Sequence, residues 1–142
     1  MIEHQLVEYL RDDAYIRDRV SGRIYPGKAL QGTRGEVLII REITSNPIYT
    51  IDLEAGIHDK VIQIDCYAAS PRSAFTLSER VRDVLSGYRG TVGTTDPVYI
   101  QSCRIISSGQ DTEQPSDKSD RWFNRYRFDF ALFVDATIPT FT

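Results

Sequence analysis

Few side chains of this sequence suit nucleophilic or metal chemistry, and they stand far apart. Its two histidines, His4 and His58, form no H-x-x-x-H or H-E-x-x-H motif, and no serine sits in a G-x-S-x-G elbow. Cys66 and Cys103 belong to no C-x-x-C motif, so two buried free thiols are expected in place of a redox or zinc site. The sequence therefore predicts no catalytic residue, no metal ligand and no bound cofactor.

Two acidic pairs could in principle hold a cation, but both have a simpler interpretation. Asp12 and Asp13 precede a short apolar segment and suit the N-cap of a helix. Asp117 and Asp120 lie in a polar stretch, where exposed carboxylates are usual. Neither pair is predicted to bind a metal.

Three glycines invite comparison with a phosphate-binding loop. Gly87, Gly90 and Gly93 follow a predicted helix, whereas a phosphate loop leads into a helix N-terminus. They are predicted to be turn glycines.

The charged side chains leave a nucleic-acid-binding surface open as an alternative. Its basic and aromatic residues would be Arg80, Arg82, Arg89, Arg104, Tyr88 and Tyr99. The net charge of −3 and the pI near 5.4 favour scattered, solvated charges instead. Retention on heparin or single-stranded DNA at physiological salt would separate these hypotheses.

Length and composition indicate one folded domain over residues 1–142. Hydrophobic residues make up 41% of the chain and charged residues 26%, which is ordinary globular usage. The first ten residues lack the pattern of a signal peptide, and no apolar stretch is long enough to cross a bilayer. We therefore expect a protein that stays in the cytoplasm and makes no contact with a membrane.

Arginine is strongly preferred over lysine, with 14 arginines, 3 lysines and 8 tyrosines. Protein interfaces show the same enrichment of Arg and Tyr over Lys. A genome rich in arginine codons would produce the same bias, so both interpretations stay open.

Two main helices are predicted from apolar periodicity. Ile2 to Arg11 carries an apolar residue at every fourth position, and a shorter helical segment ends near Ser21. Pro71 to Leu85 has helical spacing, with Ser70 as its N-cap.

The strand prediction rests on alternation and on β-branched residues. The predicted strands are Val37 to Ile43, Ile48 to Leu53 (a second strand or a bulged continuation), Val61 to Tyr67 with its even-numbered residues in the core, Val98 to Ile106, and Arg121 to Asp135 with Trp122, Phe128 and Phe130 in the core. The last two are natural antiparallel partners. Between them, Ser107 to Asp120 contains no apolar residue and is predicted to be a long exposed loop.

This order of elements predicts an α+β fold, in which an antiparallel-rich β-sheet packs against the two main α-helices. The 15 residues of the last strand would extend about 50 Å, whereas a compact chain of this length is under about 40 Å across. The strand must therefore bend or project with its hairpin, and a projecting edge can pair with a neighbouring subunit.

Five segments occur in an order and spacing that match one known family. They are GRIYPG (residues 22–27) after the first helix, SNPIYTID (45–52), VIQIDCYA (61–68), the Ala74 to Leu85 helix closing in GYRG (87–90), and RFDF (127–130). Over nearly its whole length the chain resembles the tail completion and tail terminator proteins of long-tailed phages. The Ser107 to Asp120 stretch is longer and more polar than in that family.

The resemblance implies a structural subunit without catalytic residues or cofactor. Such a subunit forms a ring of its own copies, commonly six, at the head-proximal end of the tail tube. It stops growth of the tube, binds the major tail tube protein and the head-tail connector or neck protein, and leaves the lumen open to DNA. It is made in the host cytoplasm and ends in the virion. Prophage remnants and gene transfer agents use similar subunits.

Three other functions stay open at this stage. A neck or connector adaptor would differ from a terminator in its partner. A small nucleic-acid-binding domain would use the arginines named above, and a small hydrolase would need a convergent site that two distant histidines do not supply.

Overall fold

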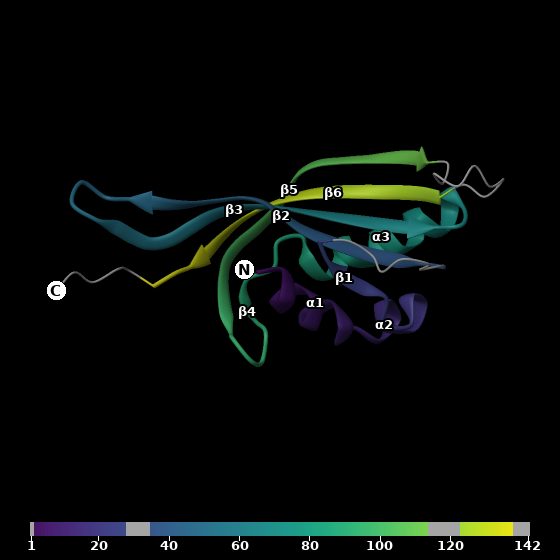
Figure 1. Ribbon diagram of the computed structural model, residues 1–142, viewed down its shortest axis with the longest axis horizontal. Coiled ribbons are helices and arrows are strands. Elements are labelled where there is room, and N and C mark those ends of the chain that lie inside the picture. The colour runs from purple at the N-terminus through teal and green to yellow at the C-terminus, as the bar shows by residue number, and fades with distance from the viewer. Residues whose placement is uncertain (1, 28–34, 114–122, 138–142) are drawn as a thin grey trace.

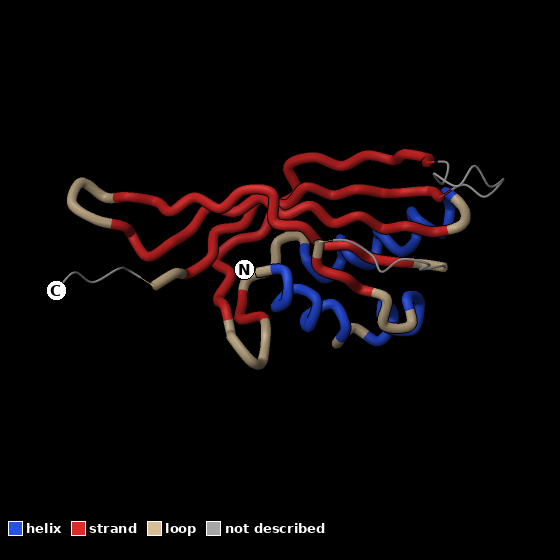
Figure 2. Tube along the Cα trace, viewed as in Figure 1, coloured by secondary structure: helices blue, strands red, loops and turns tan. Residues whose placement is uncertain are grey.

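Three helices pack against one face of a six-stranded sheet (Figure 1; Figure 2). The computed structural model describes residues 2–27, 35–113 and 123–137. In chain order the elements are α1 (Glu3–Arg11), α2 (Ala14–Val20), β1 (Ile24–Pro26), β2 (Val37–Tyr49), β3 (Glu54–Ala68), α3 (Pro71–Leu85), β4 (Gly90–Val92), β5 (Val98–Glu113) and β6 (Phe123–Asp135).

The strands lie across the sheet in the order β1-β2-β3-β6-β5-β4. β1 runs parallel to β2, and the other neighbouring pairs are antiparallel. The prediction of an α+β domain with an antiparallel-rich sheet against its helices is confirmed.

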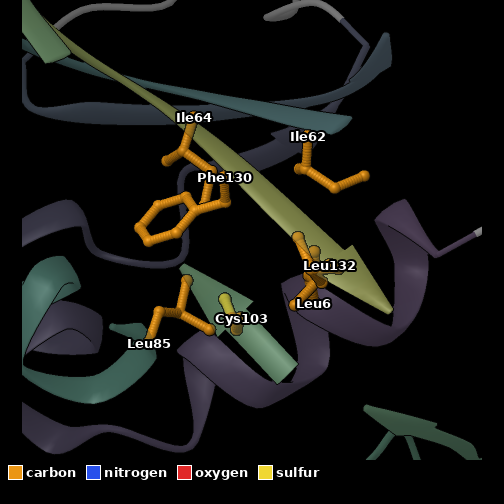
Figure 3. Close-up of a pocket in the computed structure, with 7 residues that line it drawn as sticks. All are labelled: Leu6, Ile62, Ile64, Leu85, Cys103, Phe130 and Leu132. Atoms are coloured by element: carbon orange, nitrogen blue, oxygen red, sulfur yellow. The ribbon is translucent and has the colours of Figure 1, made fainter. Parts of the chain in front are cut away.

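The two-residue period of the central strands decides which side chains meet the helices. Ile62, Ile64 and Cys66 are fully buried, as predicted for the even-numbered residues of β3. β6 places Phe130 opposite Ile62 and Phe128 opposite Ile64, so both strands direct their apolar rows into the same core. Figure 3 shows the centre of this core, formed by Leu6, Ile62, Ile64, Leu85, Cys103, Phe130 and Leu132.

The helix ends follow local sequence. The hydroxyl of Ser70 accepts a hydrogen bond from the Ser73 amide at 3.1 Å and caps α3. Asp13 caps α2 in the same way, accepting from the Ile16 amide at 3.0 Å. Ser21 ends α2 in the left-handed region, with φ at 49°. Both predicted main helices are confirmed, as α1 and α3.

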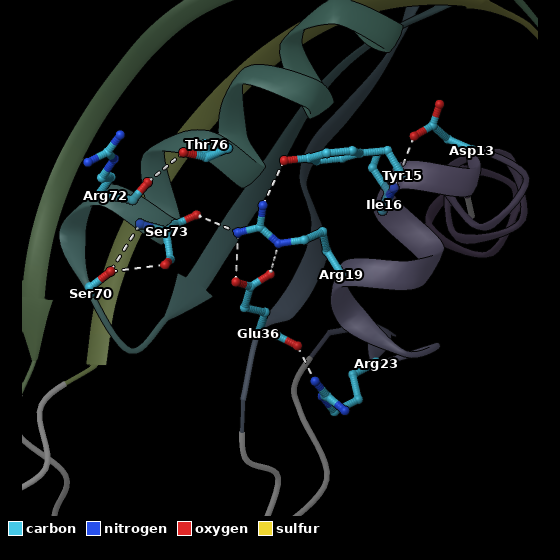
Figure 4. Close-up of polar contacts among 10 residues, drawn as sticks. All are labelled: Asp13, Tyr15, Ile16, Arg19, Arg23, Glu36, Ser70, Arg72, Ser73 and Thr76. Atoms are coloured by element: carbon cyan, nitrogen blue, oxygen red, sulfur yellow. Dashed lines mark hydrogen bonds and ion pairs between the residues drawn. The ribbon is translucent and has the colours of Figure 1, made fainter.

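Ion pairs fix α2 between α3 and the start of β2, and Figure 4 shows the pair formed by Arg19 and Glu36. Arg19 donates two hydrogen bonds of 2.7 Å to the carboxylate of Glu36, and these bonds raise the pKa of the guanidinium. The Arg80 guanidinium donates to Asp13 from Nε at 3.1 Å, and this contact holds the pKa of the Asp13 carboxyl below its usual value. The short helix is thereby anchored on both sides.

Two short strands went unpredicted. Neither β1 nor β4 is among the strands predicted from sequence, and Gly90, predicted to be a turn glycine, begins β4. Each has three residues. Their strand conformation comes from pairing with β2 and β5, and a periodicity argument cannot detect so short a partner.

β2 is one strand that spans both the predicted strand Val37 to Ile43 and the start of the predicted segment Ile48 to Leu53. It continues to Tyr49 with register shifts between Glu42 and Thr44 and between Pro47 and Tyr49. The predicted bulged continuation is therefore correct for Ile48 and Tyr49 and wrong for Thr50 to Leu53, which form a turn because the chain reverses there into β3. Proline is found mainly on edge strands, where a missing amide donor can face solvent, and β2 has an open outer edge at this point.

The prediction of an exposed loop over Ser107 to Asp120 is wrong in its first half. Residues Ser107 to Glu113 continue β5 and pair with β6, from Ser107 opposite Asp129 to Glu113 opposite Phe123. Ser107 and Ser108 are exposed, as expected. The polar residues of this segment therefore indicated solvent exposure correctly, but they did not indicate an irregular backbone. The remainder of that stretch lies outside the described residues, as does Trp122.

Candidate functional site

The β2–β3 hairpin extends away from the helices as an arm, which comprises residues 44–58 (Figure 1). β6 flanks β3 as far as the pair Ile57 and Asp135, and beyond it the arm is two-stranded in the described part of the chain. At its base the Lys60 ammonium donates to Glu42 at 2.6 Å and to the Ser45 hydroxyl at 2.8 Å. The sequence predicted that the last strand bends or projects with its hairpin at the β5–β6 connection, whereas the arm is the β2–β3 hairpin.

The tip of the arm is an ordered turn that presents apolar side chains to solvent. The amide of Thr50 donates to the Leu53 carbonyl at 2.7 Å, and the Thr50 hydroxyl donates to the same oxygen at 2.8 Å. Ile51 between them is fully exposed, and Tyr49 and Leu53 are 68% and 53% exposed. Apolar side chains held rigidly in water are typical of a binding surface.

Both edges of the sheet offer unpaired backbone within the described residues. β1 covers only Leu38 to Ile40 of β2, and β4 covers only Val98 to Ile100 of β5. Each open stretch has a register shift at an exposed isoleucine, Ile43 on β2 and Ile106 on β5. Each strand shifts once more, between Pro47 and Tyr49 on β2 and between Ile100 and Ser102 on β5. Open edges of this kind accept a strand or a flank from another chain.

A groove of about 510 Å³ lies between α3 and the β5–β6 hairpin. Apolar side chains of Ile105, Tyr126 and Phe128 line it, and Phe75 of α3 extends this apolar lining by packing edge-on against Tyr126 at 5.7 Å between ring centroids. The remaining lining residues are Glu79, Arg82, Ser86, Arg104 and Ser108. The groove therefore combines an apolar lining with polar and charged walls.

The residues suited to catalysis stay apart. His4 is exposed on α1, and His58 lies in the arm with its Nε2 4.0 Å from a Glu54 oxygen. Within residues 2–27, 35–113 and 123–137, no three His, Cys, Asp or Glu side chains converge as metal ligands. Asp13 is a helix cap as predicted, and Asp117 and Asp120 lie outside the described residues.

The two cysteines are buried free thiols, which confirms the expectation from sequence. Burial raises the pKa of Cys103 to about 12 and raises the pKa of Cys66 as well. Such thiols are poor nucleophiles at neutral pH because the thiolate is scarce.

Three arginines of the candidate nucleic-acid-binding surface each contact a different residue of the subunit. Arg80 pairs with Asp13, and Arg89 donates to the Tyr99 hydroxyl at 3.2 Å. The Arg104 guanidinium lies over the Phe133 ring, 5.5 Å from its centroid. The geometry favours structural roles for these arginines over a shared phosphate-binding surface.

The sequence missed the apolar character of the arm tip. Ile48 to Leu53 was interpreted as strand, which hid the full exposure of Ile51. The signal was present in the alternation of Tyr49, Ile51 and Leu53 around a polar Asp52 at a turn. None of the helices in the described residues has the length and apolar character needed to cross a membrane.

Comparisons with known proteins rest on structure alone. No protein-family model and no curated protein matches this sequence. The chain is similar to one chain of a solved structure described as "Virion of native gene transfer agent (GTA) particle". The two chains are 18% identical, the alignment covers 93% of this chain and 94% of the other, and the TM-score is 0.64. At this identity, the likeness establishes a shared fold.

Proposed function

We propose that this chain is a structural component of the virion of a phage or phage-derived particle, and that it serves as its tail terminator. The observation that carries the proposal is the fold, shared over almost the full length of both chains with a subunit of a gene transfer agent particle. The order of sequence segments resembling tail completion proteins supports the same role independently.

The surface of the subunit suits assembly better than solution chemistry. Among the described residues, the most exposed large apolar side chain is Ile51, at the tip of a projecting arm, and the sheet has two open edges. The two edges differ in sequence, so contact between them joins copies head to tail. Head-to-tail contacts form a closed ring when the rotation between copies closes.

In this proposal the ring is a hexamer of this chain that caps the tail tube. One side binds the major tail tube protein and stops its polymerisation, the other binds the head-tail connector or neck protein, and DNA passes through the lumen. The chain is made in the host cytoplasm, carries no cofactor and catalyses no reaction.

The test is to delete the gene from a producing strain and image the particles by electron microscopy. Overlong tubes that lack heads would support a terminator. Tails of normal length that fail to join heads would identify a neck adaptor instead. Normal particles with normal tail length would overturn both roles, and a tag on this chain should locate it at the upper end of the tail.

A further inference from the structure

The tip of the arm exposes apolar surface whose burial against a partner would be favourable. Ile51 is fully exposed on a turn held by hydrogen bonds, so little conformational freedom is lost when it binds. Removing an exposed isoleucine side chain from water favours association. Residues 44–58 also carry two carboxylates, Asp52 and Glu54, and no lysine or arginine. The tip is thus an apolar wedge with negative charge.

The groove between α3 and the β5–β6 hairpin has the complementary chemistry. Its apolar lining is formed by Ile105, Tyr126 and Phe128. Arg82 on its wall is 56% exposed and lies 4.0 Å from Glu79, at the outer limit of an ion pair. The Arg82 guanidinium is therefore available to a second carboxylate.

One copy of the chain cannot bring these two surfaces together. The arm leaves the body at one end of the sheet, whereas α3 lies toward the other end (Figure 1). The sheet between them is stiff because β3 is paired on both sides there, with β6 from Ile57 to Ala68 and with β2 as far as Tyr67. The groove must therefore receive the arm of another molecule.

We propose that the arm tip of one copy inserts into the α3/β5–β6 groove of the next, with Ile51 on the apolar lining and Asp52 beside Arg82. The contact joins two different surfaces, so each copy both gives and receives an arm, as a closed ring requires. This inference rests on the proposed function, because it names one contact between neighbouring copies of the proposed ring.

Engineered cysteines test the contact directly. One chain carries Ile51→Cys and a second carries Ser108→Cys, which lies in the groove on β5; the native cysteines are buried. Mixed and oxidised, the two chains should give disulfide-linked pairs that contain one of each. A chain with both changes should give a ladder of linked copies. Thr76→Cys, exposed on α3 but not a groove residue, is the matched control in place of Ser108→Cys.

Charge reversal gives a second measurement. Asp52→Arg and Arg82→Asp should each weaken self-association up to about fivefold, the range of a surface ion pair, and the combined variant should recover it. Cross-links between two Ile51→Cys chains, equal yield with the Thr76→Cys control, or no cross-link in purified protein and in particles would overturn the inference. If the particles nevertheless carry the chain at the tail end, the proposed function stands and only this contact fails.

Discussion

Ile43 and Ile106 lie on opposite open edges of one sheet, and each occupies a point where its strand shifts register against its partner. Each is also 52% exposed. A bulge twists an edge strand and discourages uncontrolled pairing, whereas an exposed isoleucine favours contact. An edge with both features is suited to side-chain contact with a specific partner and is poorly suited to regular strand pairing with any exposed strand.

The first prediction separates folding from assembly at these two positions. Ile43→Thr and Ile106→Thr should each change the free energy of unfolding of the dilute monomer by less than about 0.5 kcal/mol, as for exposed sites generally. Ile62→Ala, at a fully buried site on β3, should cost about 2–5 kcal/mol. Urea unfolding measures all three. A cost at Ile106 comparable to that at Ile62 would mean that this isoleucine serves the subunit and not an interface.

The second prediction concerns Asp13 at low pH. The hydrogen bond from Arg80 is the largest cause that lowers the pKa of the folded Asp13 carboxyl below its ordinary value of 3.8. Because the folded pKa lies below the unfolded one, the contact stabilises the protein above pH 3.8. That stabilisation is lost as the pH falls through the folded pKa.

Asp13→Asn is the matching variant, since asparagine keeps the N-cap but lacks the charge. At neutral pH it should be less stable than the native chain, and the difference should shrink as the pH falls below about 3.8. Urea unfolding at a series of pH values measures the difference. A constant difference down to the most acidic point would show that the Arg80 contact contributes nothing through charge.

The third prediction concerns Arg19 and Glu36, which join α2 to the start of β2 through two hydrogen bonds of 2.7 Å. A lysine cannot reproduce this two-pronged geometry. Arg19→Lys should therefore cost about 1 kcal/mol of unfolding free energy. Arg17→Lys, on an exposed position of the same helix, is the control and should be close to neutral. If both variants lost the same unfolding free energy, the two hydrogen bonds from Arg19 to Glu36 would make no specific contribution to stability.

The fourth prediction concerns the thiols. Cys66 and Cys103 should react with a thiol reagent at pH 8 only as fast as the protein opens, because both are buried with raised pKa values. Both should react at once in urea. Ser107→Cys on the exposed part of β5 provides a fast-reacting control. Rapid labelling of a native thiol without denaturant would contradict the burial.

The sequence predicted best what local interactions decide. Ser70 and Pro71 define the start of α3 through a cap and a fixed φ, which depend on neighbouring residues alone. β1 depends instead on pairing with Leu38 to Ile40 across a connection, and Ser107 to Glu113 depends on pairing with β6. A polar segment can continue a strand when a neighbouring strand supplies the hydrogen bonds. The local sequence does not show which neighbouring strand that is.

The exposure of the arm could not be predicted from the sequence for a related reason. Its residues could be assigned to strands from their types, but their exposure depends on where the helices stop relative to the sheet. Ile62 and Ile51 have the same side chain, and only the three-dimensional arrangement buries one completely and exposes the other completely.

The last prediction concerns the stiffness of the arm tip. Thr50 closes the turn through its hydroxyl, which donates to the Leu53 carbonyl at 2.8 Å and accepts from the Leu53 amide at 3.3 Å. Thr50→Val keeps the shape of the side chain but removes both bonds. The tip should then be more mobile, so ordering it on binding costs about 0.5–1.5 kcal/mol more, which corresponds to self-association weaker by roughly two- to tenfold.

The unfolding free energy of the monomer should stay the same within about 0.5 kcal/mol, because the turn is exposed and remote from the core. Thr44→Val, at an exposed position on β2 near the base of the arm, is the control for the loss of a hydroxyl. Sedimentation of concentrated protein measures association, and urea unfolding measures stability. Association unchanged in Thr50→Val, or reduced equally in Thr44→Val, would show that a preformed tip is not what the partner recognises.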